Sequence, residues 1–376
     1  MENNAQSSAL VFLNTSRSWG GLEMNTVSLA KWMLKYGNTE IWCHPYSPIA
    51  KQAQMEGLTI QYISKRSKLF PLRAAYVMAK KMKKIGSRKL FFCDNKDMSL
   101  CCWAKIFNPS LRLFYQQHMQ IGVDKKDWLH THRYQYLDKW ISPLNYLAEE
   151  VKQKTNIDPQ KIVCIPLGVD IQKLLAGKLL TKMIAQSHWH LSTNRPVIGI
   201  LGRLDRLKNQ HIVIEAVHIL KQRNIFVDLL IVGEPTREKA QQVYAHELIQ
   251  QVIEAQLESQ VSFHPFTDQI TNFYNALDLF VMATDCETYG MVTLEAMLCG
   301  VPVLASNAGG SPEILQNGKY GSLFQPSNAQ DLANKMIYIL DNKELIIQKA
   351  ELANEYVSLN FDMNSETQKI HNLVNN

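Results

Sequence analysis

Two glutamates eight residues apart flank the start of an apolar helix in the second half of the 376-residue chain. Glu287 lies in a loop after the predicted strand 279–283, and Glu295 lies inside the helix that begins near Met291. Gly290 lets the backbone approach a ligand closely, and the free N–H groups of a helix start favour an anion. A carboxylate on a packed helix needs polar partners, which sugar or ribose hydroxyls supply. The alternative is an acid favoured by the helix dipole, followed by one exposed helical glutamate.

A basic loop, residues 202–208, directly follows the strongly apolar segment 197–201. Phosphates are usually bound by loops at the carboxyl ends of parallel strands. The guanidinium of Arg203 can fork onto phosphate oxygens, and Lys208 adds a point charge. The loop therefore predicts either a phosphate site or an ordinary solvated surface, and its own residues leave both open.

A glycine loop, residues 307–314, follows the next predicted strand and ends in a helix start, with Pro312 in the first turn. Gly309 and Gly310 can present backbone N–H groups to a phosphate. A tight turn with no ligand fits the same residues equally well.

Short apolar runs alternate with helical patterns in both halves of the chain, which is typical of parallel sheets covered on both faces. The strands predicted in the first half are 9–13, 40–43, 60–63, 90–93 and 111–115. The strands predicted in the second half are 197–201, 228–232, 261–263, 279–283 and 301–305. The sequence thus predicts an α/β protein with two doubly wound domains, whose ligands bind at the carboxyl ends of the strands.

Three motifs in a fixed order carry a resemblance to a known family: Gly202-Arg203 with Lys208, the Glu287/Glu295 pair, and the 309–313 loop. They resemble the donor site of the retaining GT-B glycosyltransferases of glycosyltransferase family 4. The resemblance covers the second half of the chain well and the first half loosely. It implies a GT-B fold, that is, two Rossmann-like domains with an interdomain cleft. One departure is Asn209, which follows Lys208 where the family often has glycine.

The resemblance implies a role for each donor-site residue. Arg203 and Lys208 would hold the diphosphate and stabilise the leaving nucleotide, because negative charge develops there. Glu287 would bind hydroxyls of the transferred sugar, and Glu295 the ribose hydroxyls. The implied donor site also includes Gly202, Gly290, Met291 and Val292. No metal is implied, and the nucleotide sugar is a co-substrate in place of a bound cofactor.

Three residues of the first half resemble the acceptor side of the family site. Gly20 and Gly21, in the first loop, would approach the donor phosphate and the acceptor. His118 follows the predicted strand 111–115 and resembles the family position near the reacting acceptor hydroxyl. A structural role for this histidine is an equal alternative. For His44, His130 and His132 we expect surface or packing roles.

The same resemblance predicts the domain boundaries. We expect an N-terminal acceptor-binding domain over 1–170, a linker over 171–195 and a C-terminal nucleotide-sugar-binding domain over 196–358. The remaining residues, 359–376, are expected to form a helix that crosses back to the N-terminal domain.

Charge and hydropathy bear on the surroundings of the protein. The net charge is +6, and no apolar run is long enough to span a membrane, so we expect a cytoplasmic protein. The stretch from Lys65 to Lys89 holds ten Lys or Arg residues and no acid, with apolar residues at helical spacing. We expect the apolar stripe to be core and the charges to meet anionic lipid at the inner face of the membrane.

The predicted function is transfer of a hexose-type sugar from a nucleoside-diphosphate sugar to a saccharide or lipid-linked acceptor, in cell-surface polysaccharide or lipopolysaccharide biosynthesis. Two alternatives stay open: a sugar-nucleotide epimerase, and a GT-B protein that binds sugar nucleotides without transfer. Nucleic-acid binding is not expected, because only Phe70 and Tyr76 interleave with the basic residues. The chain has no GxGxxG or P-loop motif for a dehydrogenase or kinase.

Overall fold

The computed structural model describes residues 9–64, 67, 69–176, 181–192 and 194–376. The chain folds into two compact units, which are described separately. Unit 1 consists of Met1–Gly168 with Met363–Asn376, and unit 2 consists of Val169–Asp362.

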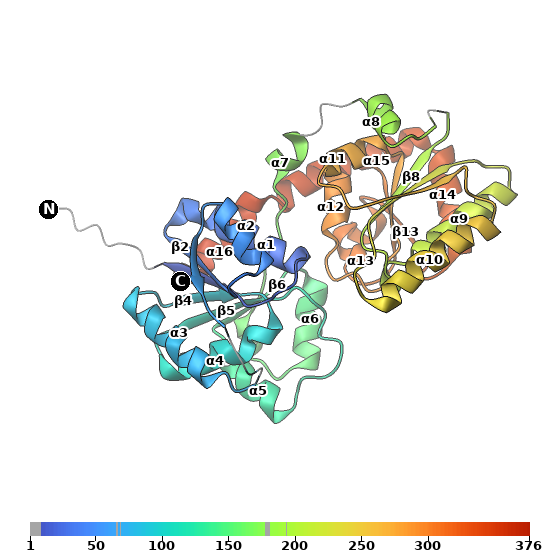
Figure 1. Ribbon diagram of the computed structural model, residues 1–376. Helices are drawn as coiled ribbons and strands as arrows, with labels where there is room; N and C mark the ends of the chain where they lie inside the picture. Colours follow the sequence, from blue (N-terminus) through green and yellow to red (C-terminus); the bar gives the residue numbers. More distant parts are fainter. Residues whose placement is uncertain (1–8, 65–66, 68, 177–180, 193) are drawn as a thin grey trace. The chain divides into compact units, whose positions relative to one another are not determined.

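Unit 1 is built on a seven-stranded parallel sheet with the order β3-β2-β1-β4-β5-β6-β7 (Figure 1). Its strands are β1 Leu10–Asn14, β2 Thr39–Cys43, β3 Thr59–Tyr62, β4 Lys89–Phe92, β5 Arg112–Gln116, β6 Lys139–Ser142 and β7 Ile162–Cys164. Its α-helices are α1 Gly21–Met33, α2 Pro48–Met55, α3 Leu72–Lys84, α4 Met98–Phe107, α5 Trp128–Gln135, α6 Asn145–Lys154 and α16 Met363–Asn375. Short 3₁₀ turns are η1 Leu34–Tyr36, η2 Asn95–Asp97 and η3 Pro159–Lys161.

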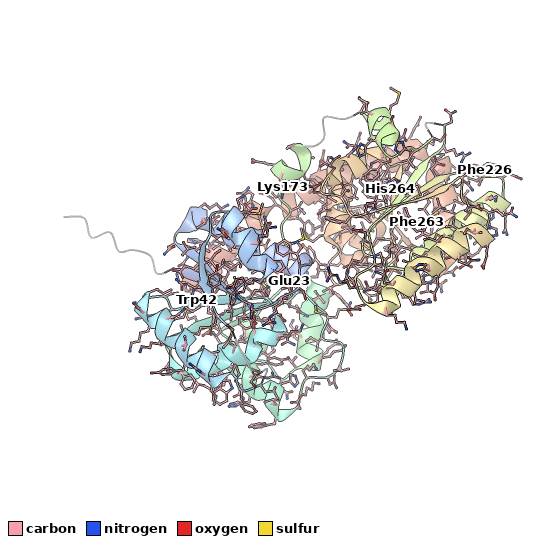
Figure 2. All side chains as sticks on the ribbon, in the orientation of Figure 1. Glu23, Trp42, Lys173, Phe226, Phe263 and His264 are labelled. Atoms are coloured by element: carbon pink, nitrogen blue, oxygen red, sulfur yellow. The ribbon has the colours of Figure 1, made fainter. Side chains whose placement is uncertain are left out.

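Alternate residues of the central strands of unit 1 enter two different cores, as the two-residue period of a strand requires. Val11 and Leu13 of β1 pack with buried residues of α3, α4, α5 and α6. Phe12, on the opposite face, packs with residues of α1, α2 and α16. Trp42 of β2, labelled in Figure 2, is buried in the first of these cores. The sheet is therefore covered on both faces, and its near-continuous apolar strands follow from that.

The last helix, α16, belongs to unit 1 although unit 2 precedes it in the chain. Its buried residues Ile370 and Val374 join the core that contains Val27 and Met33 of α1. The chain leaves unit 1 at Gly168 and returns at Met363. Next to these points, the N–H of Val169 donates to the carbonyl oxygen of Phe361 at 2.8 Å.

Unit 2 is built on a six-stranded parallel sheet with the order β10-β9-β8-β11-β12-β13 (Figure 1). Its strands are β8 Val197–Leu201, β9 Asp228–Val232, β10 Val261–His264, β11 Leu279–Met282, β12 Val303–Ser306 and β13 Ser322–Phe324. Its α-helices are α7 Ile171–Ala176, α8 Lys182–His188, α9 Gln210–Gln222, α10 Lys239–Glu254, α11 Ile270–Ala276, α12 Met291–Leu298, α13 Ser311–Ile314, α14 Ala329–Asp341 and α15 Lys343–Asn360. Its 3₁₀ turns are η4 Arg206–Lys208 and η5 Gln316–Gly318.

Each sheet reverses its strand order once, next to its first strand. In unit 1 this point lies between β1 and β4, and in unit 2 it lies between β8 and β11. Where the strand order reverses, the loops that follow the two neighbouring strands run to opposite faces of the sheet. This leaves a crevice at the carboxyl ends of the strands. The predicted α/β class with two doubly wound sheets is confirmed, and the loops singled out in the sequence follow β8 and β11 of unit 2.

Candidate active site

The loop after β8 is held close to the neighbouring strand by two glycines. Gly202 has a φ of +149°, and its N–H donates to the carbonyl oxygen of Val232 at 3.0 Å. A Cβ on Gly233 would lie 1.9 Å from the carbonyl oxygen of Gly202, so only glycine allows the two loops to approach this closely. Arg203, the next residue, is exposed at the carboxyl end of β8.

Asn209 joins the β8 loop to the β11 loop. It has a φ of +55°, a left-handed conformation that glycine adopts freely and asparagine tolerates. Its side-chain Nδ2 donates to the carbonyl oxygen of Ala283 at 3.0 Å and to Oδ2 of Asp285 at 2.9 Å. An asparagine therefore adopts the left-handed conformation required at this position and adds two hydrogen bonds that glycine cannot make.

Lys208 and Glu287 meet directly at this edge of the sheet. The Nζ of Lys208 lies 2.7 Å from Oε2 of Glu287, and their side chains are 28% and 16% exposed. An ion pair that is partly withdrawn from water is screened less than a surface pair. The structure thus brings together a cation suited to phosphate and a carboxylate suited to hydroxyl groups, from two loops 79 residues apart.

The glycine loop after β12 packs on the backbone of Glu287. The N–H of Gly310 donates to the carbonyl oxygen of Glu287 at 2.9 Å. Gly309 has a φ of +60°, and a Cβ at this position would lie 2.3 Å from the same oxygen. This loop therefore positions Glu287, a role that the sequence did not indicate, because the contact joins residues that are distant in the chain.

Helix α12 begins at Met291, four residues after Glu287. Gly290 is its N-cap, with a φ of +85° and a ψ of +54°, which favours glycine. Met291 and Val292 form the start of the helix, where the N–H groups have no acceptor within the helix itself. An anion or a polar ligand group can accept these hydrogen bonds.

Glu295 is half-buried on α12 and is not the exposed helical glutamate of the alternative interpretation. Its Oε2 lies 2.9 Å from the hydroxyl of Tyr274, which also lies 3.0 Å from the carbonyl oxygen of Val292. Burial raises the pKa of Glu295 to about 7, and the hydrogen bond from Tyr274 opposes this shift.

Asp285 was missed by the sequence analysis. Its carboxylate accepts hydrogen bonds from Asn209, from the hydroxyl of Ser306 at 3.0 Å and from the hydroxyl of Ser327. It therefore ties the loop after β11 to the loop after β8, to the last residue of β12 and to the loop after β13. A single aspartate two residues before Glu287 gives no sequence signal for such a role.

Gly20 and Gly21 lie at the start of α1 in unit 1. Gly20 is the N-cap with extended backbone, at φ −163°, and its carbonyl oxygen accepts from the N–H of Met24 at 2.9 Å. An added Cβ on Gly20 would lie 3.4 Å from Oε2 of Glu23, a residue labelled in Figure 2, and one on Gly21 would meet nothing within 4 Å. Neither glycine is required by its own backbone or packing.

His118 follows β5 in unit 1 and is half-buried. Its Nε2 lies 3.2 Å from Oε1 of Gln116 and 3.5 Å from Nδ2 of Asn25. Burial lowers the pKa of His118 to about 4, so the imidazole is neutral at neutral pH. A neutral imidazole can accept a hydrogen bond from a hydroxyl group.

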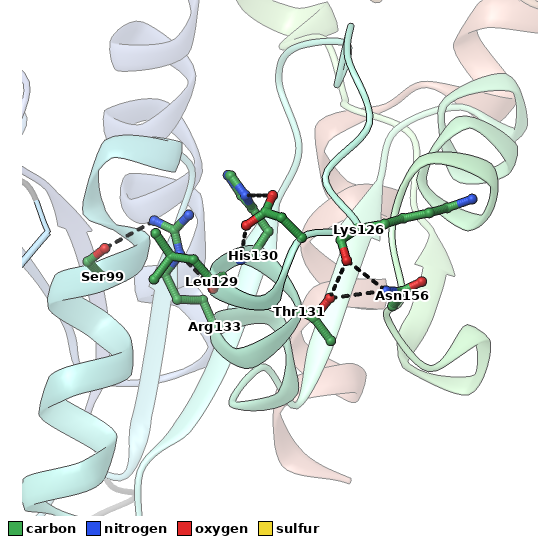
Figure 3. Close-up of polar contacts among 8 residues, drawn as sticks. Ser99, Lys126, Leu129, His130, Thr131, Arg133 and Asn156 are labelled. Carbon is green, nitrogen blue, oxygen red and sulfur yellow. Dashed lines mark hydrogen bonds and ion pairs between the residues drawn. The ribbon is translucent and has the colours of Figure 1, made fainter.

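Three other histidines of unit 1 have local partners. His130 bonds through its N–H and its Nδ1 to Asp127, the N-cap of α5, as Figure 3 shows. His132 stacks on Trp128 with ring centroids 5.6 Å apart, and Nε2 of His44 lies 2.7 Å from Arg17. These contacts agree with the packing and surface roles expected for them.

The described residues contain no group of three or more His, Cys, Asp or Glu side chains that could hold a metal ion. No helix of the described chain is long and apolar enough to cross a membrane.

Comparisons with known proteins found a family model and curated relatives that match part of this chain. Residues 184–356 match the family model described as Glycosyl transferases group 1. D-inositol 3-phosphate glycosyltransferase of Mycolicibacterium smegmatis is 27% identical over 215 residues, which cover 57% of this chain and 48% of that protein. Sulfoquinovosyl transferase of Arabidopsis thaliana is 41% identical over 110 residues, 28% of this chain and 21% of that protein. The chain thus spans about half the length, or less, of these curated relatives.

Solved structures resemble the whole chain. A glycosyltransferase from Rickettsia africae has a TM-score of 0.87 at 20% identity, with 97% of each chain covered. Anabaena HepE in complex with UDP has a TM-score of 0.87 at 21% identity, with 98% of this chain and 99% of that chain covered. By its fold, the chain is a GT-B protein. Residues 184–356, which are less than half of the chain, resemble the group 1 glycosyl transferases.

The packing of the glycine loop on Glu287 can be tested with two alanine substitutions. Gly309→Ala combines left-handed strain with a clash against the backbone of Glu287, so we expect it to lower the free energy of unfolding by about 2–4 kcal/mol. Gly300→Ala is the matched control, because Gly300 has a φ of +73° and open space around it, and we expect a loss of about 1 kcal/mol. Denaturant unfolding measures both. Equal losses would contradict the packing role.

Proposed function

We propose that this protein is a retaining GT-B glycosyltransferase. It transfers a hexose-type sugar from a nucleoside-diphosphate sugar to a saccharide or lipid-linked acceptor. The observation that carries the proposal is the ion pair of Lys208 and Glu287 at the carboxyl ends of β8 and β11. The family match over residues 184–356 and the UDP complex of the structural neighbour Anabaena HepE support it.

The chemistry of unit 2 suits departure of a nucleoside diphosphate. Negative charge grows on the leaving diphosphate, and preorganised cations and N–H groups stabilise it. Lys208 and the exposed Arg203 supply the cations, and the start of α12 at Met291 supplies N–H groups. Glu287 keeps Lys208 in place before the donor binds and then accepts hydrogen bonds from sugar hydroxyls.

Glu295 binds the ribose in this proposal. A carboxylate can accept hydrogen bonds from two adjacent hydroxyl groups, and Tyr274 fixes one of its oxygens. Unit 1 supplies the acceptor side through the loop that contains Gly20 and Gly21 and through His118. Transfer proceeds on one face of the sugar, with retention, and serves cell-surface polysaccharide or lipopolysaccharide assembly.

The proposed activity is tested by turnover of a panel of UDP-, GDP- and ADP-linked sugars, starting with UDP-glucose, because Anabaena HepE was solved with that compound. We expect slow release of free nucleoside diphosphate from one donor. Glu287→Ala should lower this rate by roughly 100-fold, in line with the loss of a group that acts in the transition state. The measurement is nucleoside diphosphate release in the absence of acceptor.

Glu258→Ala is the control for this variant, since Glu258 is an exposed glutamate of unit 2 outside the β8 and β11 loops. It should keep the rate of the parent protein. Binding of a donor without any release of nucleoside diphosphate would favour the non-catalytic alternative. Conversion of the sugar while it stays attached to the nucleotide would favour the epimerase.

Donor binding should depend on pH through Glu295. Its pKa is about 7 in the folded protein, so the carboxylate that accepts ribose hydroxyls is lost as the pH falls below 7. The dissociation constant of UDP-glucose should therefore rise below pH 7, by about tenfold per pH unit at the limit. Calorimetric titration of UDP-glucose measures this, and a sugar diphosphate diester avoids the second phosphate pKa near 6 of free UDP.

Two variants check the assignment of this pH dependence. Glu295→Gln should flatten the profile, because an amide does not titrate. Tyr274→Phe should shift it to higher pH, because the hydrogen bond from Tyr274 lowers the pKa of Glu295. A pH profile that is unchanged in Glu295→Gln would remove Glu295 from the ribose site.

The membrane setting is proposed from α3. Ala75, Ala79 and Met82 of its predicted apolar stripe are buried in the core of unit 1, whereas Leu72 and Tyr76 are exposed. The exposed cations beside them are Arg73, Lys80, Lys83, Lys84 and Arg88. Lys65, Arg66 and Lys68 of the predicted basic stretch lie outside the described residues. Exposed aromatic and apolar side chains among cations suit the surface of an anionic membrane.

Vesicle sedimentation tests this setting. Lys83→Gln with Lys84→Gln should weaken binding to phosphatidylserine vesicles by roughly 30-fold, at about 1 kcal/mol per charge. Lys51→Gln with Lys126→Gln removes two other exposed lysine charges of unit 1 and should have a smaller effect. Equal losses in the two double variants, or equal binding to neutral phosphatidylcholine vesicles, would contradict a lipid-facing α3.

A further inference from the structure

A chain of hydrogen bonds links the last helix of unit 1 to His118. Glu366 on α16 is 1% exposed and accepts two hydrogen bonds, one on each carboxylate oxygen. Nε2 of Gln116 donates to Oε1 at 2.8 Å, and the N–H of Gly168 donates to Oε2 at 2.7 Å. The other end of the Gln116 amide lies 3.2 Å from Nε2 of His118. One side chain, that of Gln116, thus connects the buried carboxylate of Glu366 to the histidine.

The carboxylate of Glu366 determines how the Gln116 amide is oriented. An ionised carboxylate only accepts hydrogen bonds, so the amide must direct its NH₂ group at Glu366 and its oxygen away from it. That oxygen lies 3.6 Å from Sγ of Cys93. Burial raises the pKa of the Cys93 thiol far above its usual value, so the thiol keeps its proton and acts as a donor. The contacts with Glu366 and with Cys93 therefore require the same orientation of the Gln116 amide.

The Gln116 orientation in turn determines the tautomer of His118. An amide oxygen accepts, so Nε2 of His118 must carry the proton to make the 3.2 Å contact. In the neutral imidazole, Nδ1 then has a lone pair. The Asn25 amide lies 3.5 Å from Nε2, at the outer limit of a hydrogen bond, and makes no comparable demand.

We infer that Glu366 is a positioning residue of this protein: through Gln116 it holds His118 as the Nε2–H tautomer, with Nδ1 as a hydrogen-bond acceptor for a substrate hydroxyl. The contact of Nδ1 with a hydroxyl rests on the proposed function, whereas the tautomer follows from the hydrogen bonds within unit 1. The same carboxylate also bonds Gly168, the last residue before the chain leaves unit 1.

Glu366→Gln gives a sharp expectation, because it keeps the size of the side chain and removes one acceptor. The N–H of Gly168 needs an acceptor, so the new amide turns its oxygen toward Gly168 and its NH₂ toward Gln116. Gln116 must then rotate and direct its own NH₂ at Nε2 of His118. We therefore expect His118 to invert to the Nδ1–H tautomer.

The tautomer can be read without any substrate, from ¹H–¹⁵N correlations of the imidazole in protein with ¹⁵N-labelled histidine. His118→Gln assigns the signals by removing them. Burial raises the pKa of Glu366 to about 7, so the spectra are recorded at pH 8, where the carboxylate predominates. The parent protein should show Nε2–H, and Glu366→Gln should show Nδ1–H. An unchanged tautomer in folded Glu366→Gln would overturn the inference.

Two further variants separate positioning from folding. Glu40→Gln is the matched control, since Glu40 is a buried glutamate of the same unit that accepts from Nε1 of Trp42 at 2.8 Å. Glu40→Gln should leave the Nε2–H tautomer of His118 unchanged. Gln116→Met removes the connecting amide, so adding Glu366→Gln to it should cause no further change in the tautomer. A further inversion in this double variant would show that Glu366 acts by another route.

The kinetic expectation is a loss in kcat of roughly 10- to 100-fold for Glu366→Gln, which reaches at most the lower limit of the contribution of about 100- to 10,000-fold that is typical of a positioned general base. KM for the donor should stay within about twofold, because the residues proposed to hold its diphosphate lie in unit 2. Glu366→Asp, which restores a carboxylate, should recover part of the rate. An inverted tautomer with an unchanged kcat would overturn the role of Nδ1. An inverted tautomer in a protein that turns over no donor would support the positioning by Glu366 and refute the proposed function.

Discussion

The contact between Lys208 and Glu287 depends on the strand order of unit 2. Two loops can meet in this way only if β8 and β11 are neighbours, and they are neighbours because the sheet reverses its order at this point. The loops after β9 and β12 then support the pair from both sides: Gly233 packs on the β8 loop, and Gly310 holds the backbone of Glu287. Lys208 and Glu287 form a candidate site because the loops after β8, β9, β11 and β12 together fix the positions of these two side chains.

Buried and half-buried carboxylates recur in both units, and each has donors to satisfy it. Asp97 in unit 1 accepts from the N–H of Thr15 at 2.8 Å, and Asp285 in unit 2 accepts from three side chains. Glu295 and Glu366 have raised pKa values near 7, because burial outweighs their hydrogen bonds. Such groups change charge close to neutral pH. Carboxyl groups of this kind are frequent at functional sites, where a structural role alone does not account for the cost of burial.

The sequence predicted the parts of this structure that depend on local apolar pattern. The five strands expected in unit 1 match β1 to β5 within one or two residues, and the strand 197–201 matches β8. Strands β6, β7 and β13 were missed, because they are only three or four residues long, and β6 also has a polar residue at each end. The predicted linker, 171–195, contains α7 and α8 and belongs to unit 2. Short edge strands gain their stability from pairing, which a local pattern does not report.

For the candidate site too, the sequence predicted some features and not others. Its charged residues could be named from their types and from their places after predicted strands, as with Lys208 and Glu287. The contacts that position them could not. The packing of Gly309 on Glu287 and the hydrogen bonds of Asp285 join loops that only the folded sheet brings together. Glu366 is the extreme case, because 250 residues separate it from Gln116.

The choice of glutamate over glutamine at position 366 has a physical reason in the number of donors that converge on it. Burying a carboxylate is costly, and a neutral amide of the same size would avoid most of that cost. However, two donors point at this side chain, the N–H of Gly168 and the amide of Gln116. A glutamine has one acceptor oxygen and would leave one of them facing another donor unless Gln116 rotated. Only a carboxylate accepts from the Gly168 N–H and the Gln116 amide at the same time. These two hydrogen bonds offset part of the cost of burying the charge. They also fix one orientation of Gln116, and Gln116 in turn fixes the tautomer of His118.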